Sequence, residues 1–150
     1  MSQSLAKIIL HIVFSTKNRA NLIPKHLLQE IHSYIAEVSR NHGSEAFRVG
    51  GTQNHIHIAC TLPRTLAVSQ LLEEIKKSSS KWIKKRDVLS SGFSWQAGYG
   101  VFSLGYSQLN NLVKYIDKQE EHHHQKNFQD ELIELLEKYD LKYDEKYLWD

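Results

Sequence analysis

The spacing of hydrophobic positions changes along the chain, and each spacing predicts an element. The segment "AKIILHIVFSTK" (6–17) is a run of β-branched and aromatic residues that ends in turn-forming residues, which predicts a buried strand. Pro24 is followed by apolar residues at helical spacing as far as Gly43, which predicts a helix that this glycine caps. The chain is therefore expected to begin with a strand and a helix.

Two short β-branched segments come next. "EAFRVGG" (45–51) and "HIHIACTL" (55–62) are separated by Thr-Gln-Asn, so we expect two strands joined as a hairpin. After Pro63, Thr65 is placed to cap a second helix. The inward stripe of this helix is expected to contain Val68, Leu71, Leu72, Ile75, Trp82 and Ile83.

The segment "FSWQAGYGVFSLGYS" (93–107) is rich in glycine and aromatic residues, which predicts one or two strands with bends. Its aromatic side chains would ordinarily belong to a core, and stacking on unpaired bases is the alternative. Ser107 is placed to cap a third helix, and a fourth is expected over "FQDELIELLEKY" (128–139). The third helix should face inward with Leu109, Leu112, Val113 and Ile116.

The predicted order is strand, helix, strand, strand, helix, strand, followed by further helices. This is the order of the ferredoxin-like or RRM-like plan, an antiparallel sheet with helices packed on one face. The expected fold class is therefore α+β, as a single domain over residues 1–150 with additional C-terminal helices. In this plan the first and third strands are central, and we expect the other face of the sheet to stay free for a site.

Composition and charge narrow the class of partner. The 150 residues, 41% of them hydrophobic, suit one core better than two. The net charge of +2 is unevenly spread: residues 1–119 carry 15 Lys and Arg against 7 Asp and Glu, and residues 120–150 carry 4 against 10. A basic body favours a polyanionic partner. No segment resembles a membrane span or a signal peptide, so we expect a cytoplasmic protein without a membrane partner.

The single cysteine, Cys60, excludes an intrachain disulfide and a multi-cysteine zinc site. Because it lies in an apolar strand, we expect it to be a buried small hydrophobic residue rather than a nucleophile.

Two histidines give the first sign of chemistry. His55 and His57 alternate in a predicted strand, so they point to the same face, and two converging imidazoles can hold a metal. Such a pair alone is more often an ordinary polar face.

Tyr115 and Gln119 are neighbours one turn apart on the third predicted helix, with His122 on the same flank. A boundary tyrosine and a solvated glutamine are the ordinary interpretation of that spacing.

The combination of these segments resembles a known family. "NHIHI" (54–58), "WQAGYGVFS" (95–103), "KYIDKQEEHH" (114–123) and "FQDEL" (128–132) together look like the single-tyrosine HUH transposases of small insertion sequences, TnpA-like enzymes of the IS200-like type. The resemblance runs over nearly the whole chain. It implies that His55 and His57 are the metal pair, that Gln119 is the third ligand and that Tyr115 is the nucleophile.

The resemblance also implies an activity. Members of this family cut single-stranded DNA with hairpin ends, keep the 5′-phosphate on the tyrosine, leave a 3′-hydroxyl and rejoin strands. They act as homodimers in which the tyrosine can be supplied in trans. Two imidazoles and an amide oxygen suit Mg²⁺ or Mn²⁺. No nucleotide cofactor is expected, and the sequence contains no phosphate-binding G-x-x-x-x-G-K-[ST] loop.

A basic cluster on the second predicted helix is the candidate for binding the DNA backbone, although a solvated helix face is the ordinary role of such residues. It consists of Lys76, Lys77, Lys81, Lys84, Lys85 and Arg86. The run His122–His124 is either a second metal site or a polar helix end. Two other functions stay open: an immobile, domesticated relative that nicks structured single strands, and a non-catalytic RRM-like module that binds nucleic acid.

Overall fold

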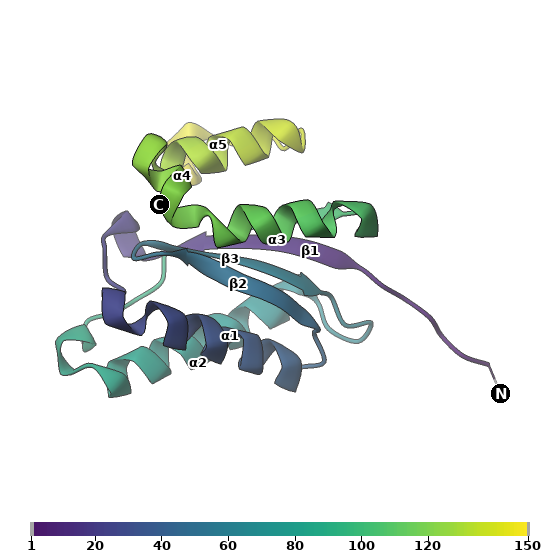
Figure 1. The fold of residues 1–150 in the computed structure, drawn as a ribbon, viewed down its shortest axis with the longest axis horizontal. Helices are drawn as coiled ribbons and strands as arrows, with labels where there is room; N and C mark the ends of the chain where they lie inside the picture. Colours follow the sequence, from purple (N-terminus) through teal and green to yellow (C-terminus); the bar gives the residue numbers. More distant parts are fainter. Residues whose placement is uncertain (1, 150) are drawn as a thin grey trace.

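A single antiparallel sheet organises the molecule. The computed structural model describes residues 2–149, without the side chains of residues 122–124. The strands lie in the order β2-β3-β1-β4, with β1 and β3 at the centre (Figure 1). Their bounds are Ile9–Ser15 for β1, Ala46–Thr52 for β2, His55–Thr61 for β3 and Gly100–Leu104 for β4. This order confirms the predicted α+β plan.

Helices cover both faces of the sheet. In Figure 1, α1 and α2 lie against one face, and α3, α4 and α5 lie over the other. The helices are α1 (Leu28–Asn41), α2 (Val68–Arg86), α3 (Leu109–Asp117), α4 (Gln119–Gln125), α5 (Phe128–Lys138) and α6 (Glu145–Leu148). Short 3-10 turns occupy Lys17–Arg19, Lys25–Leu27, Val88–Ser90 and Tyr106–Gln108.

Alternate residues of β1 pack in different cores. Leu10, Ile12 and Phe14 lie in the core that includes residues of α1 and α2. Ile9 and Val13 belong to clusters with residues of α3 and α5 on the opposite face. All seven residues of β1 are buried. A strand buried on both faces reads as a continuous hydrophobic run, which is why the sequence of this strand does not alternate.

The expectation that the second face of the sheet stays free is wrong. α3 and α5 cover it (Figure 1), and its apolar residues are the physical reason. Ile9 and Ala59 pack with Leu112 and Ile116 of α3, and Val13 packs with Phe128 of α5. Removal of these side chains from water favours the covered arrangement.

The predicted third helix is in fact two helices. α3 ends at Asp117, Lys118 forms a turn, and α4 begins at Gln119. The Lys118 amide donates to the Tyr115 carbonyl at 3.3 Å, as in a 3-10 turn. Residues 117–127 contain no hydrophobic side chain, so nothing apolar would hold a straight extension of α3 against the sheet. Tyr115 and Gln119 are therefore neighbours across a helix break.

Other boundaries differ by a few residues. Of the one or two strands expected within 93–107, the structure forms β4, and the preceding part contributes one isolated bridge between Trp95 and Thr16. α2 begins after Ala67 rather than after the expected cap Thr65. α3 likewise begins after Gln108 rather than after Ser107.

Cys60 is fully buried on β3, as predicted. Burial raises the pKa of its thiol to about 11, so the thiol stays protonated at neutral pH. Of the helices that the structure describes in residues 2–149, none combines the length and the hydrophobicity needed to cross a membrane.

The close packing of α3 on the sheet depends on Gly50. This residue of β2 is paired with His57 of β3. A Cβ atom at position 50 would lie 2.6 Å from Cγ2 of Ile116 and 3.1 Å from the Ile116 carbonyl oxygen. The first of these contacts is too short for real atoms and the second is tight, so α3 reaches this depth without displacement only over a residue without a side chain.

We therefore predict that Gly50→Ala lowers the free energy of unfolding by about 1–3 kcal/mol through overpacking. Urea denaturation would measure it. The matched control is Gly92→Ala, because a Cβ at position 92 meets nothing within 4 Å. Equal stability of the two variants would show that α3 does not rest on Gly50.

Candidate metal and tyrosine site

Two histidines of the central strand β3 form the floor of the site. His55 and His57 are both 0% exposed and lie on the face covered by α3 and α5. Their ring centroids are 5.1 Å apart and the rings are nearly perpendicular. The period of two in a strand places both on one face, as the sequence predicts.

Each histidine is held from behind through Nδ1. Nδ1 of His55 contacts Oδ1 of Asn54 at 2.8 Å and Oγ1 of Thr52 at 3.0 Å. Nδ1 of His57 contacts Nε2 of His11 at 2.7 Å. Both Nε2 atoms therefore point away from these partners, towards the side chains that the C-terminal helices bring over the sheet.

Gln119, which the family resemblance implies as the third ligand, lies beside His55. Its side chain is 1% exposed, and its Oε1 is 2.9 Å from Nε2 of His55. The helix break at Lys118 precedes it directly. Its Nε2 donates to Oε2 of Glu131 at 3.2 Å, so the amide links the histidine strand to α5.

Glu131 joins the other members of the site, and sequence reasoning missed it. This residue of α5 is 4% exposed. Its Oε1 is 2.9 Å from Nε2 of His57 and 3.7 Å from Nε2 of His55. The available signal was its position in the helix: Glu131 lies on the same buried side as Phe128 and Leu136. A carboxylate there needs buried partners, because an isolated charge in a core is costly.

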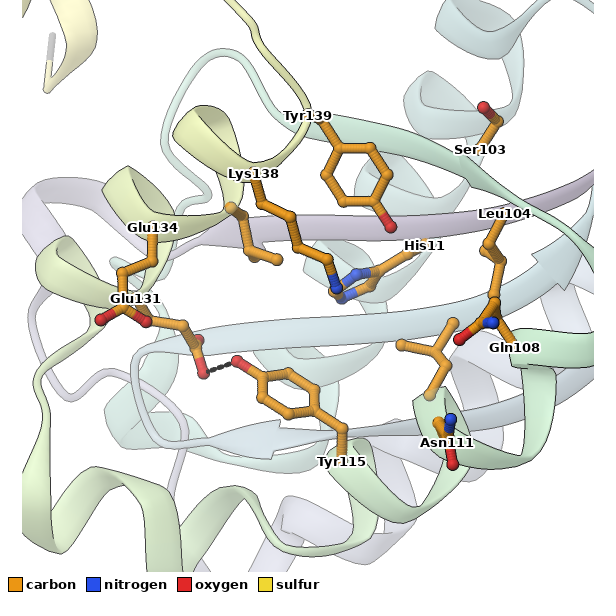
Figure 2. A pocket seen from close by; sticks show the side chains of 12 residues that line it. His11, Ser103, Leu104, Gln108, Asn111, Tyr115, Glu131, Glu134, Lys138 and Tyr139 are labelled. Atoms are coloured by element: carbon orange, nitrogen blue, oxygen red, sulfur yellow. Dashed lines mark hydrogen bonds between the residues drawn. The ribbon is translucent and has the colours of Figure 1, made fainter.

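Tyr115 of α3 completes the cluster. Its hydroxyl donates to Oε2 of Glu131, as Figure 2 shows. Its ring meets that of His57 edge to face, with centroids 5.6 Å apart. Burial and the negative charge of Glu131 raise the pKa of Tyr115 far above its ordinary value. The phenol is therefore protonated in this arrangement.

The donor set fits a divalent cation. His55, His57 and Glu131 each offer one ligand atom, and these atoms all lie within 4.8 Å of one another. Two imidazole nitrogens with a carboxylate oxygen suit first-row divalent metals, and oxygen ligands suit Mg²⁺ and Mn²⁺. The carboxylate of Glu131 is an addition to the ligand set that the family resemblance implies, and it lies next to Gln119.

The basic cluster lies elsewhere. α2 packs on the opposite face of the sheet from Tyr115 (Figure 1). The ammonium of Lys76 donates to the carbonyls of Gln96 and Gly98 at 2.9 and 2.5 Å, and burial lowers the pKa of Lys76 to about 8. The Arg86 guanidinium is 2.7 Å from Glu30. The remaining members, Lys77, Lys81, Lys84 and Lys85, are exposed.

DNA binding by this cluster stays a prediction, and Lys76 is already engaged by the 96–98 loop. The side chains of His122–His124 lie outside the described part of the chain, so the two interpretations of that run stay open. Of the aromatic residues in 93–107, Phe102 is buried, Trp95 packs against the core, and Tyr99 and Tyr106 are exposed.

Comparison with known proteins identifies the family and similar folds. The family model described as "Transposase IS200 like" matches residues 4–119, which confirms the resemblance inferred from the sequence. No curated protein sequence matches the chain.

Two solved structures are similar in fold. A transposase candidate from Deinococcus radiodurans R1 is 14% identical, with a TM-score of 0.61, and the match covers 79% of this chain and 98% of that one. A REP-associated tyrosine transposase bound to a REP hairpin is 19% identical, with a TM-score of 0.59, and the match covers 82% of this chain and 74% of that one.

His11 controls which nitrogen of His57 faces the site. Burial, followed by the neighbouring His57, lowers the pKa of His11 to about 3, so His11 is neutral. A neutral ring can accept a hydrogen bond from Nδ1 of His57, and in that tautomer Nε2 of His57 carries the lone pair that would bind a cation held between it and Glu131.

We therefore predict that His11→Phe weakens Mn²⁺ binding about 10- to 100-fold, because it deletes this acceptor. Isothermal titration calorimetry would measure it. His11→Gln keeps an acceptor and should recover part of the affinity. Unchanged Mn²⁺ affinity in the folded His11→Phe protein would contradict the positioning role.

Proposed function

Because this chain belongs to the family of IS200-like transposases, we propose that it is a metal-dependent transposase that cleaves and rejoins single-stranded DNA through a 5′-phosphotyrosine. One observation carries the proposal. The hydroxyl of Tyr115 donates a hydrogen bond to the carboxylate of Glu131. The same carboxylate contacts Nε2 of His57. A nucleophile and a candidate metal site thus share one buried cluster.

His55, His57 and Glu131, with Gln119 beside them, would hold the divalent cation, with Mg²⁺ and Mn²⁺ as the candidates. When bound, such a cation polarises a phosphate and stabilises the charge that develops on it. The residues behind the histidines, His11 and Asn54, orient the imidazoles.

Tyr115 supplies the attacking oxygen. The new bond joins this oxygen to phosphorus, and the bond from phosphorus to the 3′ oxygen breaks. The phenol loses its proton and the leaving 3′ oxygen takes one up, so the released strand ends in a 3′-hydroxyl. One phosphodiester replaces another, so rejoining needs no nucleotide cofactor. Glu131 holds the hydroxyl in place and also raises the pKa of Tyr115, so this hydrogen bond must change before the oxygen can attack.

Single-stranded DNA with hairpin ends is the proposed substrate. A structural relative was solved bound to a REP hairpin, and the family match supports the same class of ligand. Within one chain Tyr115 already lies at its own histidine pair, so the site can form in cis. A homodimer with the tyrosine supplied in trans stays a proposal that rests on the family resemblance.

Two alternatives are tested together with this proposal. A domesticated relative would keep the chemistry of Tyr115 without mobility of its gene. A non-catalytic RRM-like module would bind the same DNA without a covalent step.

We predict that Tyr115→Phe abolishes the covalent protein–DNA adduct, with a loss of at least about 1,000-fold, because it removes the nucleophilic oxygen. The substrate is a pool of single strands that carry one hairpin and randomised flanks. The adduct is measured on a denaturing gel. Tyr106→Phe is the matched control, because Tyr106 is 69% exposed. Adduct formation by Tyr115→Phe would exclude Tyr115 as the nucleophile, and an absent adduct with retained binding in the wild type would favour the RRM-like module.

The ligand set makes a separate prediction. Glu131→Gln should lower Mn²⁺ affinity more than tenfold, because it replaces an anionic ligand with a neutral amide, and EDTA should stop cleavage reversibly. Titration calorimetry with Glu137→Gln, an exposed position on the same helix, gives the control. Equal affinity of the two variants would remove Glu131 from the ligand set and leave Gln119 as the expected third ligand.

A further inference from the structure

A cavity of about 750 Å³ opens beside Tyr115, between the edge strand β4 and the helices α3 and α5 (Figure 2). Its volume is in the range of cavities that bind small organic ligands. Tyr115 and Glu131 form one end of it, so the cavity is continuous with the proposed site of strand cleavage.

The walls of the cavity suit a flat ring. Leu104, Leu112 and Leu135 supply apolar surface from β4, α3 and α5. Tyr139 lines it as well, with its hydroxyl directed inwards in Figure 2. The ring of Tyr139 is stacked on that of Phe102, with centroids 4.7 Å apart and an angle of 22° between the planes. This stacking keeps one aromatic wall in place.

The charge of the lining favours a base over a phosphate. Two carboxylates, Glu131 and Glu134, line the cavity together with the ammonium of Lys138. Glu131 belongs to the proposed metal site, and the other two charges, one carboxylate and one ammonium, offset each other, so the rest of the cavity offers no net positive charge to a phosphate. A neutral base needs no such charge, and the phosphates of its strand would stay outside this part of the cavity.

Two amide side chains lie at the end of the cavity away from Glu131 (Figure 2). They are Gln108, directly before α3, and Asn111 in its first turn. Within the part of the chain that the structure describes, neither side-chain amide makes a hydrogen bond, and both residues are exposed. An amide offers one donor and one acceptor side by side, the pattern that matches the N6 and N7 edge of adenine.

We propose that this cavity binds one unpaired purine of the DNA strand, next to the phosphate that Tyr115 attacks, and that Gln108 and Asn111 read its edge. The inference rests on the proposed function and adds a base-specific subsite to it. Apolar and aromatic walls hold the ring, as in other sites for unstacked bases. The amides give the subsite its sequence preference.

Sequencing of the cut ends from the pool of hairpin-bearing single strands tests the subsite. The wild type should enrich adenine about tenfold at one fixed position beside the cut, a ratio within the discrimination that amide pairs supply. The double variant Gln108→Ala/Asn111→Ala should cut with that position nearly random. Asn110→Ala is the matched control, because Asn110 is exposed on the same helix and does not line the cavity.

A preference that survives in the double variant, or a wild type that cuts with no preference at positions beside the cut, would overturn the subsite while leaving the proposed function intact. This readout compares positions within one reaction. A general loss of stability or rate therefore does not imitate the expected result.

A binding measurement keeps the inference testable if the chain does not cut. The probe is deoxyadenosine 5′-monophosphate, titrated into the ¹⁵N-labelled full chain, with deoxyribose 5-phosphate as the probe that lacks the base. The side-chain amide signals of Gln108 and Asn111 should shift with the nucleotide and stay in place with the sugar phosphate. Absent or equal shifts with the two probes would overturn the base subsite.

Discussion

The buried carboxylate of Glu131 is the constraint on which the site depends. A charge that is 4% exposed needs polar partners, and Glu131 finds them in His57, Tyr115 and Gln119. These partners come from β3, α3 and the start of α4. Packing of α5 on the sheet therefore depends on the arrangement of the candidate catalytic groups. Loss of any one partner would leave part of the buried charge of Glu131 uncompensated.

This constraint also explains why α3 packs so deeply. Tyr115 reaches Glu131 only because α3 lies against β2, where Gly50 leaves room for Ile116. The turn at Lys118 then redirects the chain, so that Gln119 faces His55 instead of continuing along the axis of α3. A straight helix would keep Gln119 about one turn further along that axis. Gly50 and the helix break thus help to position the side chains of the site, although neither contributes a side chain to it.

The sequence predicted what local spacing determines. The alternation of His55 and His57 places them on one face in any extended strand, and this was sufficient to anticipate the pair. Two members of the cluster, His11 and Glu131, were missed because their roles depend on long-range packing. His11 contacts His57 only through the register of β1 against β3, and Glu131 arrives only because α5 returns over the sheet.

The fold places the basic cluster of α2 and the acidic residues near Tyr115 on different sides of the sheet. The exposed lysines of α2 lie on the face of the sheet away from Tyr115, whereas Glu131 and Glu134 of the acidic C-terminal segment line the cavity beside it. A basic body alone therefore does not attract a phosphate to the tyrosine. Near Tyr115, the charge of Glu131 is compensated by its hydrogen-bond partners, and a bound cation would compensate it further. Away from Glu131 the cavity has apolar and aromatic walls, so under the proposed function the exposed lysines of α2 and the cavity would contact different parts of a bound strand.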